Sequence, residues 1–167
     1  MPTLSPGERL LIFGIGNLGR QDDGLGVRLV EQLESLGLPA HVTLEANYQL
    51  APEDALLLAA HDVVLFVDAT VSPDASAPYV ISPVAPASEM SFSSHALSMG
   101  SLLALCGRLY GKAPRAFALA LPGYAFEVNA ELSPQASENL DHARRDLLQL
   151  LRVDLVSPSR PCATIRP

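Results

Sequence analysis

The sequence has few cysteines and few basic residues. Its two cysteines, Cys106 and Cys162, form neither a disulfide framework nor a CxxC zinc pair. Cys106 lies in an apolar helical stretch and is interpreted as a small core residue. Only 11 Lys and Arg stand against 18 Asp and Glu, which gives a net charge of −7. Because the basic residues are scattered, we expect no binding to nucleic-acid phosphates or to an anionic membrane.

Long apolar runs are also missing. The longest ones are far shorter than the ~20 residues that a membrane-spanning helix needs, so no membrane insertion is expected. The N-terminus lacks a basic region followed by an apolar stretch, the pattern of a signal peptide. With the two cysteines unpaired, these features predict a cytoplasmic protein.

Hydrophobic residues, by contrast, make up 49% of the 167 residues, enough to build the core of one ordinary domain. Strand and helix signals alternate along the chain, and the clearest buried strand is VVLFV, residues 63–67. This alternation predicts an α/β fold, a single-domain three-layer αβα sandwich with a mostly parallel twisted sheet. We expect this domain over residues 1–152 and a C-terminal tail over 153–167.

The remaining elements are expected as follows. Helices are predicted over 26–36, 52–60, 97–110 and 134–151, and strands over 10–13, 41–44 and 116–121. Residues 79–81 are a further candidate strand. The Ser-, Pro- and Ala-rich stretch 69–94 breaks the pattern, and a long irregular stretch in a compact domain is more often functional than idle. In sheets of this kind ligands bind outside the carboxyl ends of the strands, where the strand order reverses.

A glycine-rich loop follows the first predicted strand. Residues 14–19, GIGNLG, match the GxGxxG pattern of dinucleotide-binding proteins, and Glu45 ends the next predicted strand, where a ribose-binding acid would lie. However, that pattern needs a helix that starts within the motif, and here the loop continues through two further glycines to residue 26. The adjacent carboxylates of Asp22 and Asp23 would also repel a phosphate.

We therefore favour an extended loop that bends back and presents a carboxylate. Its shape is expected to depend on Gly14, Gly16, Asn17, Gly24 and Gly26. One acid of the pair at 22–23 is expected to complete the dipole of the following helix, and the other to face the cleft.

A second acid and a histidine are expected at the same edge. Asp68 directly follows the strand 63–67, and it would face the glycine loop if the first and third strands are neighbours. Two facing carboxylates repel unless a proton or a metal lies between them. His95 would lie in the first turn of a helix capped by Ser93 or Ser94, where the helix dipole favours the neutral, metal-binding imidazole. The structural alternatives are a solvated strand-end acid and a surface histidine.

Two carboxylates and one imidazole suit nickel, cobalt, zinc or manganese with coordination positions left open. The other three histidines are weaker candidates, because His41 and His61 are expected at the opposite edge and His142 on a solvated helix face. No Ser or Cys lies in a recognisable nucleophile elbow, which disfavours covalent catalysis.

Four blocks of sequence lie in order over residues 9–150. They are GIGNLGRQDDGLGVRLVE, HDVVLFVDA, SSHALSMGSLLAL and PGYAFEVNAELSPQASENLDHA, and NYQLAPEDALLL lies between the first two. Together they resemble the hydrogenase maturation proteases, the endopeptidases that process the C-terminus of the nickel-iron hydrogenase large subunit.

This resemblance implies that Asp23, Asp68 and His95 bind a metal, with Asp23 and Asp68 as the catalytic carboxylates. The first acid is often glutamate in the family, so Asp23 is one methylene shorter. The implied function is an endopeptidase that removes a C-terminal extension from the nickel-loaded large-subunit precursor. Nickel then arrives with the substrate, and no organic cofactor is expected. The stretch 69–94 and the GYAFE segment are expected to contact the substrate.

The sequence leaves three questions open. Either the metal or a carboxylate could activate the water. The chain could instead be a nucleotide or dinucleotide-binding module, on the strength of GIGNLG and Glu45. It could also be a non-catalytic chaperone of the large subunit.

Overall fold

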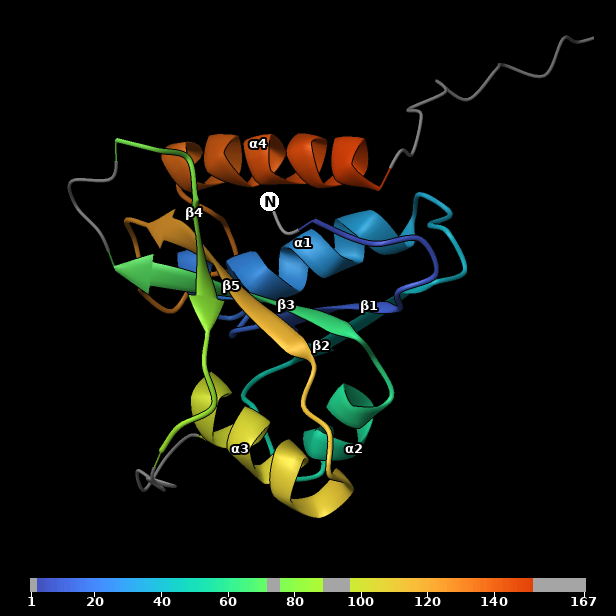
Figure 1. Cartoon of the computed structure of the whole chain (residues 1–167). Coiled ribbons are helices and arrows are strands. Elements are labelled where there is room, and N and C mark those ends of the chain that lie inside the picture. The colour runs from blue at the N-terminus through green and yellow to red at the C-terminus, as the bar shows by residue number, and fades with distance from the viewer. Residues whose placement is uncertain (1–2, 72–75, 89–96, 152–167) are drawn as a thin grey trace, which may run out of the picture.

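The computed structural model describes residues 3–71, 76–88 and 97–151. These residues form three layers, with a sheet between two pairs of helices (Figure 1). The strands are β1 (Leu10–Ile15), β2 (Val42–Asn47), β3 (Val63–Val71), β4 (Val80–Val84) and β5 (Arg115–Gly123). The helices are α1 (Leu25–Glu34), α2 (Asp54–Ala59), α3 (Met99–Tyr110) and α4 (Pro134–Leu150), and a 3-10 turn, η1, spans Gln21–Gly24.

The sheet has the strand order β2-β1-β3-β5-β4. All neighbouring pairs are parallel except β4 and β5, which are antiparallel, so β4 forms an antiparallel edge. The predicted α/β class and mostly parallel sheet are confirmed. β1 lies beside β3, as expected, and the strand order reverses between these two neighbours.

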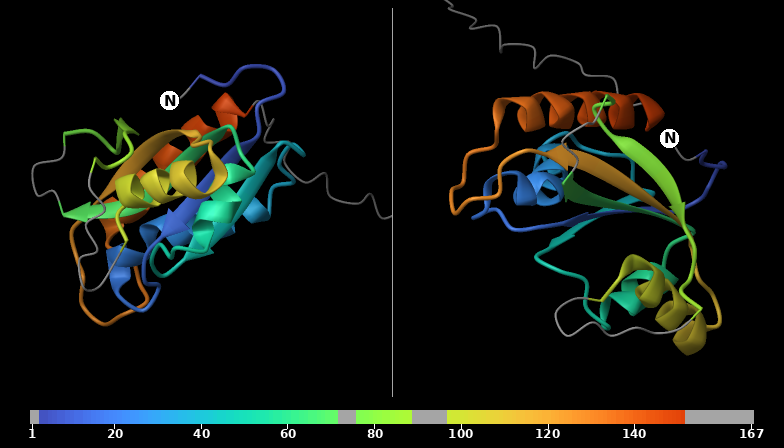
Figure 2. Two further views of the ribbon diagram at one scale, coloured as in Figure 1. Left: turned by 60° about the horizontal axis from the view of Figure 1, so that its bottom comes forward. Right: turned by 90° about the vertical axis from the view of Figure 1, so that its left-hand side faces the viewer.

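Both faces of the sheet are covered (Figure 2). Helices α1 and α4 pack on one face and α2 and α3 on the other. Alternate strand residues serve the two cores, since Leu10 and Ile12 of β1 face α1 and α4 whereas Leu11 and Phe13 face α2 and α3. This double burial explains why β1, β3 and β5 are largely continuous apolar runs rather than alternating ones.

The irregular stretch after VVLFV is shorter than predicted. β3 continues through Asp68 to Val71, whose partner in β5 is Gly123, so Asp68 lies within a strand rather than just after it. Within the predicted loop 69–94, β4 pairs with β5 over residues 80–84, a longer strand than the 79–81 expected. Both extensions depend on backbone hydrogen bonds to β5, and local sequence does not predict pairing with a distant strand.

The start of α3 also differs from the prediction. Ser98, not Ser93 or Ser94, is the N-cap, because its backbone is extended and its side chain accepts a hydrogen bond from the Ser101 N–H. The other end agrees, since Gly111 closes the helix in the left-handed conformation. The last helix, α4, begins at Pro134 as predicted, with Ser133 as its N-cap.

The predicted tail, 153–167, lies outside the described residues, and so do Cys162 and the stretch 89–96 that contains His95. Cys106 is buried in the core beneath α3, as expected. Within the described ranges no helix is long and apolar enough to cross a membrane.

Candidate active site

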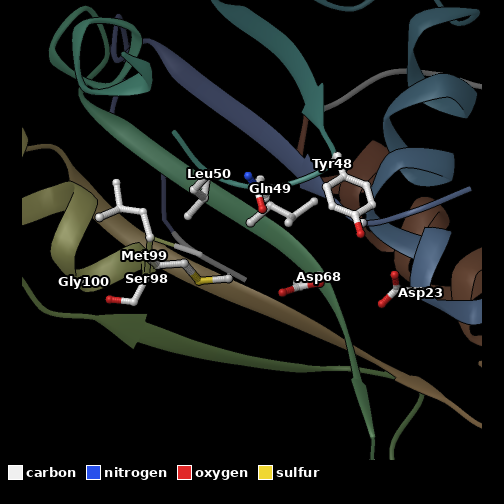
Figure 3. A pocket seen from close by; sticks show the side chains of 11 residues that line it. Asp23, Tyr48, Gln49, Leu50, Asp68, Ser98, Met99 and Gly100 are labelled. Carbon is white, nitrogen blue, oxygen red and sulfur yellow. The ribbon is translucent and has the colours of Figure 1, made fainter. Parts of the chain in front are cut away.

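A cavity of about 650 Å³ opens near the carboxyl ends of β1 and β3, beside the start of α3 (Figure 3). This is the edge of the sheet at which the sequence predicted a site. Its lining residues come from the glycine loop, the segment after β2, strand β3 and the start of α3: Ile15, Gly16, Asp23, Tyr48, Gln49, Leu50, Asp68, Leu97, Ser98, Met99 and Gly100.

Asp23 is placed in this cavity by the folding back of the glycine loop. The Asn17 N–H donates to the Asp23 carbonyl at 3.2 Å, and the Asn17 side chain accepts from the Gly19 N–H at 2.9 Å. Gly16 has φ +143°, and a β-carbon there would collide with the Asp23 carbonyl. The loop therefore bends back as expected, and Asp23 is the acid of the pair that faces the cavity.

After the loop, the start of helix α1 lies very close to strands β1 and β3. The predicted loop extended to Gly26, but the structure begins α1 at Leu25 and places Gly26 inside the helix. A β-carbon on Gly26 would collide with the backbone of Ile15 and of Val67, so this glycine lets the helix start lie directly against β1 and β3. Gly14 and Gly24 are likewise packed closely against other residues of the protein.

Asp22 points away from the cavity and is fully buried. Its carboxylate accepts hydrogen bonds from the N–H groups of Tyr124 and Ala125 and from both the N–H and the hydroxyl of Ser133. Burial raises the pKa of Asp22, but these hydrogen bonds outweigh it and hold the pKa below its ordinary value. We expected one acid of the pair to serve the following helix; instead Asp22 serves the end of β5 and the start of α4.

The whole segment between β5 and α4 is held against the glycine loop. The Arg20 guanidinium donates to the Phe126 carbonyl at 3.0 Å, and the Gln21 N–H donates to the Asn129 carbonyl at 2.6 Å. Gln21 has φ +47° and is the one non-glycine residue among the described residues with a positive φ. Its side-chain oxygen accepts a hydrogen bond from the Glu127 N–H. The sequence does not predict this contact, because the two segments lie about a hundred residues apart and neither has a local pattern that indicates the other as its partner.

Asp68 lies in β3, half-buried, on the side of the sheet that faces α2 and α3. Burial raises the pKa of Asp68 to about 6; the Ala69 N–H lowers this pKa in part, and the negative charge of Asp23 adds a smaller increase. Figure 3 shows the Asp68 carboxylate between the Met99 side chain and the Asp23 carboxylate, with the Tyr48 side chain above Asp23 in this view. The predicted pairing of Asp23 with Asp68 is thus present, and a carboxyl that titrates near neutrality can exchange protons with a substrate.

Histidines contribute little to this cavity within the described ranges. His95 lies outside them, and no group of three His, Cys, Asp or Glu side chains suited to a metal occurs among residues 3–71, 76–88 and 97–151. His61 is buried elsewhere, with its ring nitrogens 2.8 Å from the Leu57 carbonyl and from the Thr43 hydroxyl. It links α2 to β2, so its interpretation as a weaker candidate agrees with its place in the fold.

Several lining residues were missed by sequence analysis. Tyr48, Gln49 and Leu50 follow β2, and Ser98 and Met99 begin α3. The available signal for the first three was position, since they follow the carboxyl end of a parallel strand next to β1. For the other two the signal was obscured by the helix start predicted too early.

The glycine loop offers little to a phosphate. A phosphate-binding loop presents free backbone N–H groups and the N-terminus of a helix. Here the loop N–H groups donate to the protein itself: those of Gly16, Asn17, Gly19, Arg20, Gln21, Asp22 and Asp23. Helix α1 starts only at Leu25, after the whole GIGNLG motif.

No protein-family model matches the chain. Among solved structures, the [NiFe] hydrogenase maturation protease HycI from Thermococcus kodakarensis has a TM-score of 0.71 and 23% sequence identity, over 88% of this chain and 95% of that one. The hydrogenase maturating endopeptidase HybD from E. coli has a TM-score of 0.70 and 25% identity, over 86% of this chain and 92% of that one. The chain has the fold of the hydrogenase maturation proteases.

A curated protein matches part of the chain. The hydrogenase expression/formation protein HupD from Rhodobacter capsulatus is 51% identical over 45 residues, which are 26% of this chain. The match spans 21% of the length of HupD, about a fifth. The resemblance predicted from the sequence is confirmed, and the endopeptidase class predicted with it is the class of the structural relatives.

Proposed function

We propose that this chain is an endopeptidase that removes a C-terminal extension from the nickel-loaded precursor of a nickel-iron hydrogenase large subunit. The observation that carries the proposal is the pair of carboxylates, Asp23 and Asp68, that line one open cavity on the fold of the maturation proteases. These two acids are also the ones that the sequence blocks indicated. The cavity lies where α/β sheets of this kind bind ligands.

The chemistry of peptide hydrolysis fits Asp68 as the general base. A water oxygen attacks the carbonyl carbon of the scissile bond while the Asp68 carboxylate takes a proton from that water. The carbon–nitrogen bond then breaks, and the departing amine nitrogen takes the proton from Asp68. In the chain without a bound cation, the pKa of Asp68 is raised to about 6, so Asp68 is mostly ionised at neutral pH and is a stronger base than an ordinary carboxylate.

Nickel would come with the substrate rather than reside in this chain. Asp23 and Asp68 fit a divalent ion, because a cation between them would offset the charge repulsion that contributes to the raised pKa of Asp68. His95 is proposed as the third ligand on the family resemblance alone. When bound, the ion would supply Lewis-acid activation of the scissile carbonyl or of water. An ion shared between two proteins would make cleavage conditional on nickel loading.

The second candidate is a chaperone that binds the nickel-loaded precursor without cutting it, since the same two carboxylates could hold the ion. Nucleotide binding is disfavoured by the internally bonded N–H groups of the glycine loop and by Asp23 in the cavity.

The deciding experiment mixes the purified chain with nickel-loaded and nickel-free precursors and follows the precursor mass. We expect loss of a C-terminal peptide only with nickel, and no loss with Asp23→Asn, Asp68→Asn or His95→Ala. Asp141→Asn is the matched control, because this carboxylate lies on α4 with a side chain that is 55% exposed. Tight, nickel-dependent binding without any change in mass would favour the chaperone. If several precursors were neither bound nor cleaved, the proposal would be overturned.

A further inference from the structure

The cavity has two ends of different chemistry (Figure 3). Asp23 lies at one end and Leu50 and Met99 lie at the other, with Asp68 between them. Leu97 also lines the cavity and belongs, like Leu50, to the apolar core between the sheet and helices α2 and α3. The hydrolytic chemistry proposed above uses only the acidic end, so the apolar end is left without a role.

The apolar end is a preformed surface. Leu50 and Leu97 are only 6% and 9% exposed, and Met99 packs against the same core. The start of α3 is fixed by the Ser98 side chain, which accepts from the Ser101 N–H at 3.1 Å. It is fixed from outside by the Ala87 N–H, which donates to the Gly100 carbonyl at 2.9 Å. An apolar wall held in this way binds a ligand without first rearranging.

The shape of a bound peptide connects the two ends. Successive residues of an extended peptide are ~3.3 Å apart, and the cavity of about 650 Å³ extends from the carboxylates to Met99. A peptide whose scissile bond lies at the carboxylates therefore places a neighbouring side chain toward the apolar end. An aliphatic side chain gains from leaving water there, whereas a charged one loses its hydration and finds no polar partner in Leu50, Leu97 or Met99.

We propose that Leu50, Leu97 and Met99 form a side-chain subsite that takes an aliphatic residue adjacent to the scissile bond of the substrate and rejects a charged one. This inference rests on the proposed peptidase function. It makes substrate choice depend on local sequence at the cut as well as on the metal, and it assigns that part of specificity to three residues outside the acidic pair.

The first test changes only the substrate. With the cleavage site mapped by mass, the residue on each side of the cut is replaced in turn by Ala, Leu, Met, Asp and Lys, and kcat/KM is measured with the unaltered enzyme. At one of the two positions we expect Leu and Met to exceed Ala by about tenfold and Asp and Lys to fall below Ala by about tenfold or more. Equal rates for all five residues at both positions would overturn the inference.

The second test changes the subsite. Met99→Ala enlarges the apolar end and is expected to shift the preference from Leu toward Phe by about tenfold, whereas Met99→Leu, which nearly conserves volume, should keep it. Leu109→Ala is the matched control, since Leu109 lies on the same helix and is 60% exposed. An identical preference in Met99→Ala and Leu109→Ala, with both variants folded by circular dichroism, would contradict the assignment.

The two levels of proposal fail differently. Cleavage of the precursor with no side-chain preference would remove the subsite and leave the peptidase standing. No cleavage of any precursor would overturn both. Should Met99→Ala fail to fold, the substrate series decides the question, because it needs only the unaltered chain.

Discussion

Asp22 and Ser133 are joined by two hydrogen bonds across a separation of 111 residues. The Ser133 N–H donates to one carboxylate oxygen of Asp22 at 2.8 Å, and the Ser133 hydroxyl donates to the other at 2.7 Å. Ser133 is also the N-cap of α4. The pair therefore ties the start of the last helix to the loop that carries Asp23.

Removing this carboxylate should weaken the fold. Asp22→Ala leaves three backbone N–H groups without their acceptor, those of Tyr124, Ala125 and Ser133. We expect the free energy of unfolding, from urea denaturation, to fall by about 3 kcal/mol or more. Asp141→Ala, at an exposed carboxylate, should change it by less than ~0.5 kcal/mol. Similar losses for the two variants would show that Asp22 is not a structural anchor.

The raised pKa of Asp68 can be measured directly. In metal-free protein, carbon-13 NMR of the Asp68 carboxyl should give a pKa of about 6. Burial is the larger cause and the charge of Asp23 a smaller one, so Asp23→Asn should lower the pKa of Asp68 only part of the way toward its ordinary value. A pKa of Asp68 that does not move in Asp23→Asn would mean that the two carboxylates do not interact.

The same group should make stability depend on pH. Because the pKa of Asp68 is higher in the folded chain, the folded state binds more protons than the unfolded state between about pH 4 and pH 6. The stabilisation by this protonation is complete below pH 4 and is lost as pH rises through 6. Asp68→Asn avoids the loss and should be more stable than the unaltered chain by about 3 kcal/mol at pH 7 relative to pH 4. A constant difference in unfolding free energy across this range would contradict the raised pKa.

Two glycines offer opposite outcomes for the same substitution. Gly16→Ala places a β-carbon against the Asp23 carbonyl at φ +143°, so we expect a loss of about 3 kcal/mol or more in unfolding free energy and loss of cleavage. Gly107→Ala, in α3, meets nothing closer than the Ala113 side chain at 3.9 Å, and it should stabilise by about 0.5 to 1 kcal/mol. Thermal melting and the precursor mass assay measure both effects. Full cleavage by Gly16→Ala would show that the loop does not position Asp23 as described.

Local sequence was sufficient to predict most of the fold and the acidic part of the site. The apolar runs of β1, β3 and β5 are continuous because these strands are buried on both faces, and such runs can be recognised one strand at a time. Asp68 could be placed near the carboxyl end of β3 for the same reason, as the acid that directly follows a buried run, although β3 continues to Val71. That an acid of the pair at 22–23 faces Asp68 needed only one assumption about strand order, that β1 and β3 are neighbours, and it held. That this acid is Asp23 was implied by the family resemblance.

Contacts between distant segments were decided by the tertiary structure alone. The choice between Asp22 and Asp23 depended on the segment 124–133, whose N–H groups bind one acid and leave the other to the cavity. The extension of β3 and the length of β4 depended on pairing with β5. The apolar end of the cavity depended on Leu50, from the segment after β2, meeting Met99 of α3. A sequence pattern records which face of an element is buried, but which partner covers that face is a property of the assembled chain.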